Sequence, residues 1–62
     1  KSTIDRRLVQ FVNYKKSAEK GYAPSQYQLA VCYQQGIGVK SNAQLAQSWY
    51  DKAIANGYKE DN

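Results

Sequence analysis

The chain has 62 residues, of which nine are lysine or arginine, five are acidic and none is histidine, so its formal net charge is +4. A chain of this length forms one small domain with a small core, and its single cysteine excludes an internal disulfide and, without histidine, a zinc site of cysteine and histidine ligands. The lack of histidine also argues against an enzyme with a general base at neutral pH, and no run of 18 apolar residues predicts a membrane span.

The first predicted helix runs from about Thr3 to Lys20. Ser2 and Asp5 have the spacing of a capping box at its start, and Gly21 is placed to end it. Apolar residues at helical spacing predict a buried stripe of Ile4, Leu8, Phe11, Val12 and Ala18. The basic residues spread over about half of the circumference and are interpreted as a solvated face. They are Arg6, Arg7, Lys16 and Lys20.

The second predicted helix begins at Pro24, a residue that favours the first helical turn, and ends at Gln35 before Gly36. Its main apolar arc consists of Leu29, Ala30, Cys32 and Tyr33. Cys32 shares this arc with Leu29, so we interpret it as a core thiol rather than a reactive nucleophile.

The third predicted helix runs from near Asn42 to Asn56, before Gly57. Either Ser41, paired with Gln44, or Asn42 itself can cap it. About half of its circumference is apolar, which suggests burial against two neighbours. The residues on this wide face are Leu45, Ala46, Trp49, Tyr50, Ala53 and Ile54.

Two glycines one residue apart, Gly36 and Gly38, separate the second and third predicted helices. Gly36 lies where the end of a helix favours a left-handed residue, and Gly38 can adopt a second conformation that is closed to other side chains. We therefore expect a tight antiparallel helix pair, with Ile37 and Val39 pointing between its helices.

An internal repeat supports this interpretation. The stretch YKKSAEKGY at Tyr14 to Tyr22 aligns with YDKAIANGY at Tyr50 to Tyr58, an offset of 36 residues, with four identical positions. A repeat of this length predicts an all-α fold, an antiparallel helix-turn-helix repeat of an α-solenoid, with about one and a half repeats in three helices.

The stretches QYQLAVCYQQGIGV and AQSWYDKAIANG resemble the Sel-one-like repeats, relatives of the tetratricopeptide repeats. In the family pattern a Leu-Gly pair precedes a Tyr, followed by Gly-x-Gly-Val, then Ala-x-x-Trp-Tyr-x-Lys-Ala-Ala and a closing Gly. The matching residues here are Leu29, Tyr33, Gly36, Gly38, Val39, Ala46, Trp49, Tyr50, Lys52, Ala53 and Gly57. Ala30 replaces the usual Gly, Asn42 stands where Asp is common, and Ile54 replaces the second Ala.

The resemblance implies how the chain is divided and what it does. Residues 1–22 would be the second helix of a preceding repeat, residues 23–57 one complete repeat, and residues 58–62 the start of a following repeat or a tail. It implies a non-catalytic adaptor or scaffold module, a fragment of a longer array, that binds other proteins and needs no cofactor or metal. Members of the family are often found in periplasmic, secreted or endoplasmic-reticulum settings.

A candidate partner surface lies on the second predicted helix. Tyr27 and Val31 stand one turn apart, on a face that the helix pair itself does not need, and uncharged hydrogen-bonding residues flank them. The flanking residues are Gln28, Gln34 and Gln35. In stacks of such repeats the first helix of each pair lines the concave surface, which predicts a groove for a protein or peptide. The alternative is contact with a neighbouring repeat.

Two further possibilities remain open from the sequence. A basic surface of Arg6, Arg7 and Lys16, together with the tyrosines, could bind nucleic acid or another acidic partner, although the basic residues form no stripe. Such binding would weaken steeply with salt. The broad apolar third helix also predicts self-association through exposed repeat ends, near Trp49 and Ile54.

Overall fold

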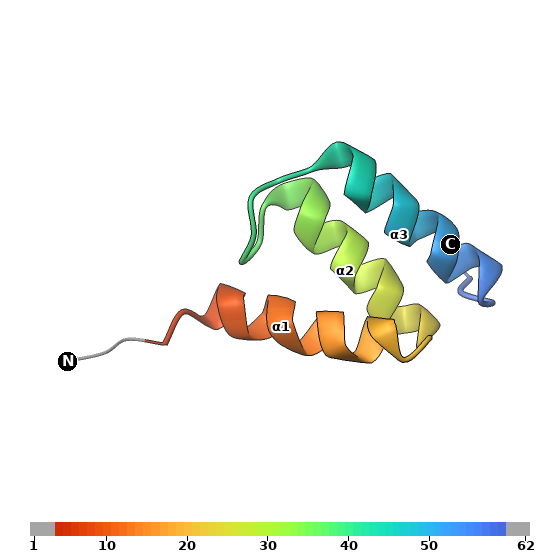
Figure 1. Cartoon of the computed structure of the whole chain (residues 1–62), viewed down its shortest axis with the longest axis horizontal. Coiled ribbons are helices and arrows are strands. Elements are labelled where there is room, and N and C mark those ends of the chain that lie inside the picture. Colours follow the sequence, from red (N-terminus) through yellow and green to blue (C-terminus); the bar gives the residue numbers. More distant parts are fainter. Residues whose placement is uncertain (1–3, 60–62) are drawn as a thin grey trace.

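The computed structural model describes residues 4–59, in which the regular structure consists of α1 (Arg6–Glu19), α2 (Ala23–Gln35) and α3 (Ala43–Ala55) (Figure 1). α2 lies between the other two helices and packs on both, and α2 and α3 run antiparallel as a hairpin. Within these residues α1 and α3 do not pack on each other. The predicted all-α helix-turn-helix architecture is confirmed.

α1 differs from its prediction at its start and in its buried face. It begins at Arg6, because the Asp5 side chain caps it by accepting a hydrogen bond from the Arg7 N–H at 2.9 Å. The predicted start at about Thr3 is therefore wrong, and Ser2, on which the predicted capping box depends, lies outside the described residues together with Thr3. Of the predicted stripe Ala18 alone is buried and Phe11 is half-buried, since one neighbour, α2, covers α1. The exposed remainder is Ile4, Leu8 and Val12.

The ends of α2 and α3 follow the predicted signals closely. Pro24 lies in the first turn of α2, and Gly36 ends that helix with φ 71° while its N–H donates to the Cys32 carbonyl. Asn42, not Ser41, caps α3 by accepting a hydrogen bond from the Leu45 N–H at 3.0 Å.

The core is made of small and medium side chains that let the helices approach closely. Its buried apolar members are Ala18, Ala23, Leu29, Ala30, Cys32, Ala46 and Ala53. Leu45 and Ile54, which the sequence predicts on the buried face of α3, are 42% and 56% exposed. They are exposed because the described residues supply α3 with a single neighbouring helix, α2, whereas the wide apolar face predicts two.

A buried glutamine connects all three helices. Gln26 of α2 is 4% exposed; its Nε2 donates to the Ala18 carbonyl near the end of α1, at 3.1 Å, and its Oε1 accepts from Asn56 Nδ2 at the end of α3, at 2.9 Å. Both ends of the buried amide are thereby satisfied, as burial of a polar side chain requires. The same residue therefore aligns the carboxyl ends of α1 and α3 against α2.

The turn between α2 and α3 reaches back to α1 (Figure 1). Gly36 and Gly38 both have positive φ, as predicted, with φ 73° at Gly38. A Cβ atom at Gly38 would overlap the Arg7 carbonyl oxygen and lie 2.8 Å from the Phe11 Cβ atom. Gly38 is thus required both by the turn and by the close approach of this turn to the backbone of α1.

The two copies of the internal repeat end in the same way. The N–H groups of Gly21 and Gly57 donate to the carbonyls of Ala18 and Ile54, each at 3.0 Å. Tyr22 and Tyr58 then donate to Ser17 and Ala53, at 3.4 and 2.9 Å. Since each donor and acceptor is displaced by the same 36 residues, the sequence repeat is also a repeat of backbone geometry.

Candidate functional site

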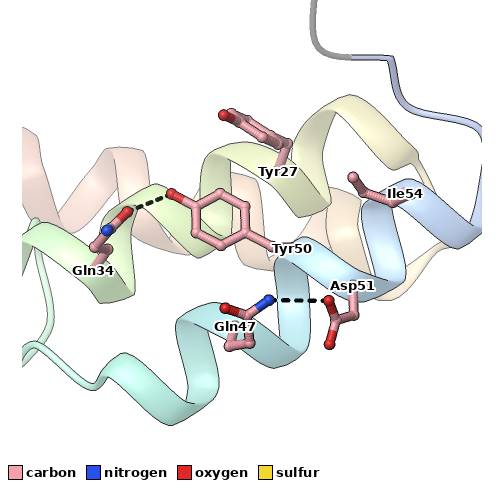
Figure 2. A pocket seen from close by; sticks show the side chains of 6 residues that line it. All are labelled: Tyr27, Gln34, Gln47, Tyr50, Asp51 and Ile54. Carbon is pink, nitrogen blue, oxygen red and sulfur yellow. Dashed lines mark hydrogen bonds between the residues drawn. The ribbon is translucent and has the colours of Figure 1, made fainter.

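An open depression of about 390 Å³ lies across α2 and α3, and we call it the α2–α3 groove (Figure 2). It is lined by Tyr27 and Gln34 from α2 and by Gln47, Tyr50, Asp51 and Ile54 from α3. The α3 residues recur at spacings of three and four, so one face of that helix supplies them all.

Aromatic rings form one part of the groove. The Tyr27 ring lies 5.0 Å from the Tyr50 ring at an interplanar angle of 64°, and it stacks on Tyr58 at 4.4 Å and 18°. Both arrangements are favourable for aromatic pairs. The expectation that Tyr27 occupies a face unused by its own helix pair is therefore wrong: Tyr27 packs on α3 and on the residues that follow it.

Two hydrogen bonds orient the polar side of the groove, as Figure 2 shows. The Tyr50 hydroxyl donates to Gln34 Oε1 at 2.5 Å, and Gln47 Nε2 donates to Asp51 Oδ1 at 3.0 Å, one turn further along α3. These bonds orient the two amide groups, so that the Gln34 Oε1 faces Tyr50 and the Gln47 Nε2 faces Asp51. Gln34 Nε2 is left as a donor and Gln47 Oε1 as an acceptor.

The predicted partner residues are divided by the structure. Tyr27 and Gln34 line the groove, whereas Gln28, Val31 and Gln35 do not; Gln28 and Val31 are half-buried and Gln35 is exposed. Sequence reasoning misses the α3 side of the groove, because it assigns Tyr50 to the core and does not treat the other three residues as a site. Their helical spacing on a single face is the available signal: Gln47, Tyr50, Asp51 and Ile54.

The charge of the groove differs from that of the chain. No basic side chain among residues 4–59 pairs with Asp51, and Lys52, the next residue, instead holds its Nζ 4.9 Å from the centre of the Trp49 ring. The ion pair recorded in this part of the chain joins Lys15 and Glu19 on α1, at 3.5 Å. Within residues 4–59, this basic chain thus has a carboxylate with no cationic partner in the same groove as two tyrosine rings.

The remaining candidate groups offer no comparable chemistry. Arg6, Arg7 and Lys16 are all exposed on α1. Cys32 is buried, and its burial raises the pKa of the thiol above the ordinary value of 9.0, which disfavours the reactive thiolate.

No group of three or more acidic, cysteine or histidine side chains within residues 4–59 is arranged to hold a metal ion. Over the same range, no helix combines the length and the apolar character needed to cross a membrane.

The sequence was compared with family models and with solved structures. A family model described as Sel1 repeat, the family called Sel-one-like above, matches residues 11–22 and again residues 23–58. The first match ends at Tyr22 and the second begins at Ala23, the first residue of α2. The two matches together span most of the chain and include every residue that lines the groove. No solved structure matched the chain.

Proposed function

The chain belongs to the Sel1 repeat family, whose repeats are non-catalytic and generally mediate protein–protein interaction, and from this premise we propose that the α2–α3 groove binds an extended segment of a partner protein. The module is an adaptor unit that forms part of a longer array of such repeats. It contributes a binding surface and carries out no reaction.

The observation that carries this proposal is the composition of the groove. Aromatic and aliphatic surface from Tyr27, Tyr50 and Ile54 lies next to hydrogen-bonding groups of Gln34 and Gln47. Protein-binding sites commonly combine such apolar anchors with a few oriented polar groups, and tyrosine is enriched among the residues that dominate binding energy.

The rigidity of the groove supports the same proposal. Tyr27 is held between two other rings, and the Tyr50 hydroxyl is held by Gln34. Side chains that are already ordered lose little conformational entropy when a partner binds, so more of the contact energy appears as affinity.

The apolar residues exposed at the two ends of the bundle fit the same picture of an array. They are Ile4, which precedes α1, Leu8, Val9 and Val12 on α1, and Leu45 on α3. In a longer array these faces would pack against neighbouring repeats, and in the isolated chain they favour self-association at high concentration. Sedimentation equilibrium tests this, and a strictly monomeric species at millimolar concentration contradicts it.

A selection experiment tests the binding proposal. Peptides are selected from a random display library with the folded chain as bait, and their affinities are measured by fluorescence anisotropy. The groove variant Gln34→Ala with Ile54→Ala should lose about tenfold in affinity, since two central contacts are removed. The matched control Asn13→Ala with Lys15→Ala, on exposed positions of α1, should bind as the parent does.

The outcomes separate the proposal from its alternative. Selected peptides that bind the groove variant and the parent equally would place the partner surface elsewhere. The basic residues Arg6, Arg7 and Lys16 are the alternative site. In that case the chain should bind an oligonucleotide, and its affinity should fall steeply between about 50 and 200 mM salt, because contacts with phosphates release counterions. Binding through the groove should respond weakly to salt.

A further inference from the structure

We infer that the α2–α3 groove recognises an arginine side chain of the bound segment, seated between the Asp51 carboxylate and the tyrosine rings. This inference rests on the proposed function and names the chemistry of its partner: a peptide that carries an arginine and lies extended across the two helices.

The first support is the state of Asp51. Its Oδ1 accepts a hydrogen bond from Gln47, which orients the carboxylate while leaving Oδ2 for another donor. The basic side chains of residues 4–59 do not neutralise it, and the nearest lysine in sequence is engaged with Trp49. A cation supplied by a partner would complete this pair.

The second support is the aromatic surface beside the carboxylate. Tyr27 and Tyr50 both line the groove that contains Asp51. A guanidinium group is planar, stacks on aromatic rings and presents several N–H donors in a fixed fork, whereas an ammonium group is compact and strongly hydrated. The combination of carboxylate and rings therefore favours arginine over lysine.

The third support comes from the two glutamines, which suit the backbone of the same peptide. Gln34 offers its Nε2 as a donor, because its Oε1 is taken by Tyr50. Gln47 offers its Oε1 as an acceptor, because its Nε2 is taken by Asp51. An extended peptide presents carbonyl and N–H groups to such a donor and acceptor.

The net charge of +4 does not prevent this recognition. Charges separated by more than a Debye length of about 8 Å at physiological salt are largely screened. Among the described residues that line the groove, Asp51 is the charged one, and the adjacent Lys52 holds its Nζ on the Trp49 ring.

The experiment uses three acetylated and amidated pentapeptides that have alanine at four positions and arginine, lysine or citrulline at the centre. Each is titrated into the ¹⁵N-labelled chain, and dissociation constants are obtained from the side-chain amide signals of Gln34 and Gln47. Citrulline has the shape of arginine without its charge. We expect the arginine peptide to bind about three- to fivefold more tightly than citrulline, the scale of a partly exposed ion pair, with lysine in between.

Two variants assign the effect to one carboxylate. Asp51→Asn keeps an oxygen for the Gln47 amide but removes the charge, so the arginine peptide should fall to the affinity of the citrulline peptide. Glu19→Gln removes one exposed negative charge from α1 and should leave the preference for arginine unchanged. Circular dichroism melting curves confirm that both variants are folded.

Three results would each overturn the inference. They are equal affinities for the arginine and citrulline peptides, equal affinities for the arginine and lysine peptides, and an Asp51→Asn variant that keeps the preference for arginine. Failure here is distinguishable from failure of the proposed function. Display-selected peptides that depend on Gln34 and Ile54 but show no arginine preference would retain the groove as a binding site and remove only its specificity.

Discussion

α1 and α3 are two copies of one helical sequence in different surroundings. The repeat aligns Ala18 with Ile54 and Tyr22 with Tyr58. Ala18 is 1% exposed beneath α2, whereas Ile54 is 56% exposed; Tyr22 is 63% exposed, whereas Tyr58 is half-buried against Tyr27. The backbone turns that end the two helices share the same hydrogen bonds. Local sequence therefore determines the backbone geometry of each copy, and the neighbouring helices determine which of its side chains are buried.

The same comparison shows why α3 lines a groove with α2 whereas α1 does not. Position 51 carries Asp where the aligned position 15 of α1 carries Lys, and Lys15 is paired with Glu19 while Asp51 pairs with no cation among residues 4–59. At the aligned positions 11 and 47, Phe11 packs on Tyr33 of α2 with ring centres 5.5 Å apart, whereas Gln47 lines the open groove. At these positions one copy packs on α2, and the other lines the groove that we propose as a binding site.

The largest expected effect comes from separating α1 from the α2–α3 pair. Gly38→Ala introduces a Cβ atom against Arg7 and Phe11 at a positive φ, so the free energy of unfolding should fall by about 3 kcal/mol, from backbone strain together with overpacking. Chemical denaturation measures the loss, and amide hydrogen exchange should show that α1 loses protection before α3 does.

Gly36→Ala is the matched control for this variant. Its φ is also positive, but an added Cβ atom would lie at an ordinary 3.4 to 3.5 Å from Val39 and Ser41. We expect a smaller loss of about 1 to 2 kcal/mol, from strain alone. Equal losses in the two variants would show that Gly38 does not govern the contact with α1.

An exchange of aligned residues tests whether the surroundings decide burial. Ala18→Ile places the larger residue of the second copy beneath α2, where overpacking should destabilise the fold by about 1 to 3 kcal/mol. Ile54→Ala makes the reverse change on an exposed surface and should alter the free energy of unfolding by less than about 1 kcal/mol. Thermal melts of both variants give the ranking, and similar destabilisation by the two would contradict the difference in burial.

The two aligned tyrosines give a finer version of this test. Tyr58→Ala removes a ring stacked at 4.4 Å on Tyr27. The loss of this pair should lower the free energy of unfolding by about 0.5 to 1.5 kcal/mol, in addition to the loss from the apolar area that is no longer buried. Tyr22→Ala removes a mostly exposed ring and should cost less. Near-ultraviolet circular dichroism should change strongly for Tyr58→Ala alone; an unchanged spectrum would exclude a persistent stack.

The smallest effect concerns Cys32, on the helix that both copies share as a neighbour. Burial raises the pKa of its thiol, so the folded chain holds this proton more tightly than the unfolded chain does. The corresponding part of the stability is fully present below the ordinary pKa of 9.0 and is lost as the pH rises above it. Between pH 8 and pH 10, the free energy of unfolding measured by chemical denaturation should decrease more for the parent than for Cys32→Ala. The variant lacks the thiol, so its own decrease measures the contribution of the other groups.

The local features of this protein follow from its amino-acid sequence. Helix ends, the turn glycines and the repeat all depend on residues close together in the chain. For this reason residue type and spacing are enough to predict the left-handed conformations of Gly36 and Gly38 and to narrow the cap of α3 to Ser41 or Asn42, of which the structure uses Asn42. They do not give the start of α1, which lies at Arg6 and not at Thr3. The motif from Leu29 to Gly57 likewise resembles the family whose model matches the chain.

Packing between the helices determines which apolar faces are covered and where the groove lies. Helical periodicity shows that Leu8, Leu45 and Ile54 belong to apolar faces, but it does not show whether a neighbouring helix covers them. Periodicity also places Tyr27 on an open surface. This prediction fails because periodicity describes one helix only, whereas the contacts of Tyr27 are with Tyr50 and Tyr58, 23 and 31 residues away in the chain. The Gln34 amide is oriented by Tyr50, which packing brings to it from α3, whereas the Gln47 amide is oriented by Asp51 one turn along the same helix. Packing of α2 on α3 therefore forms the groove that we propose as a binding surface, and it does so from residues that are distant in the chain.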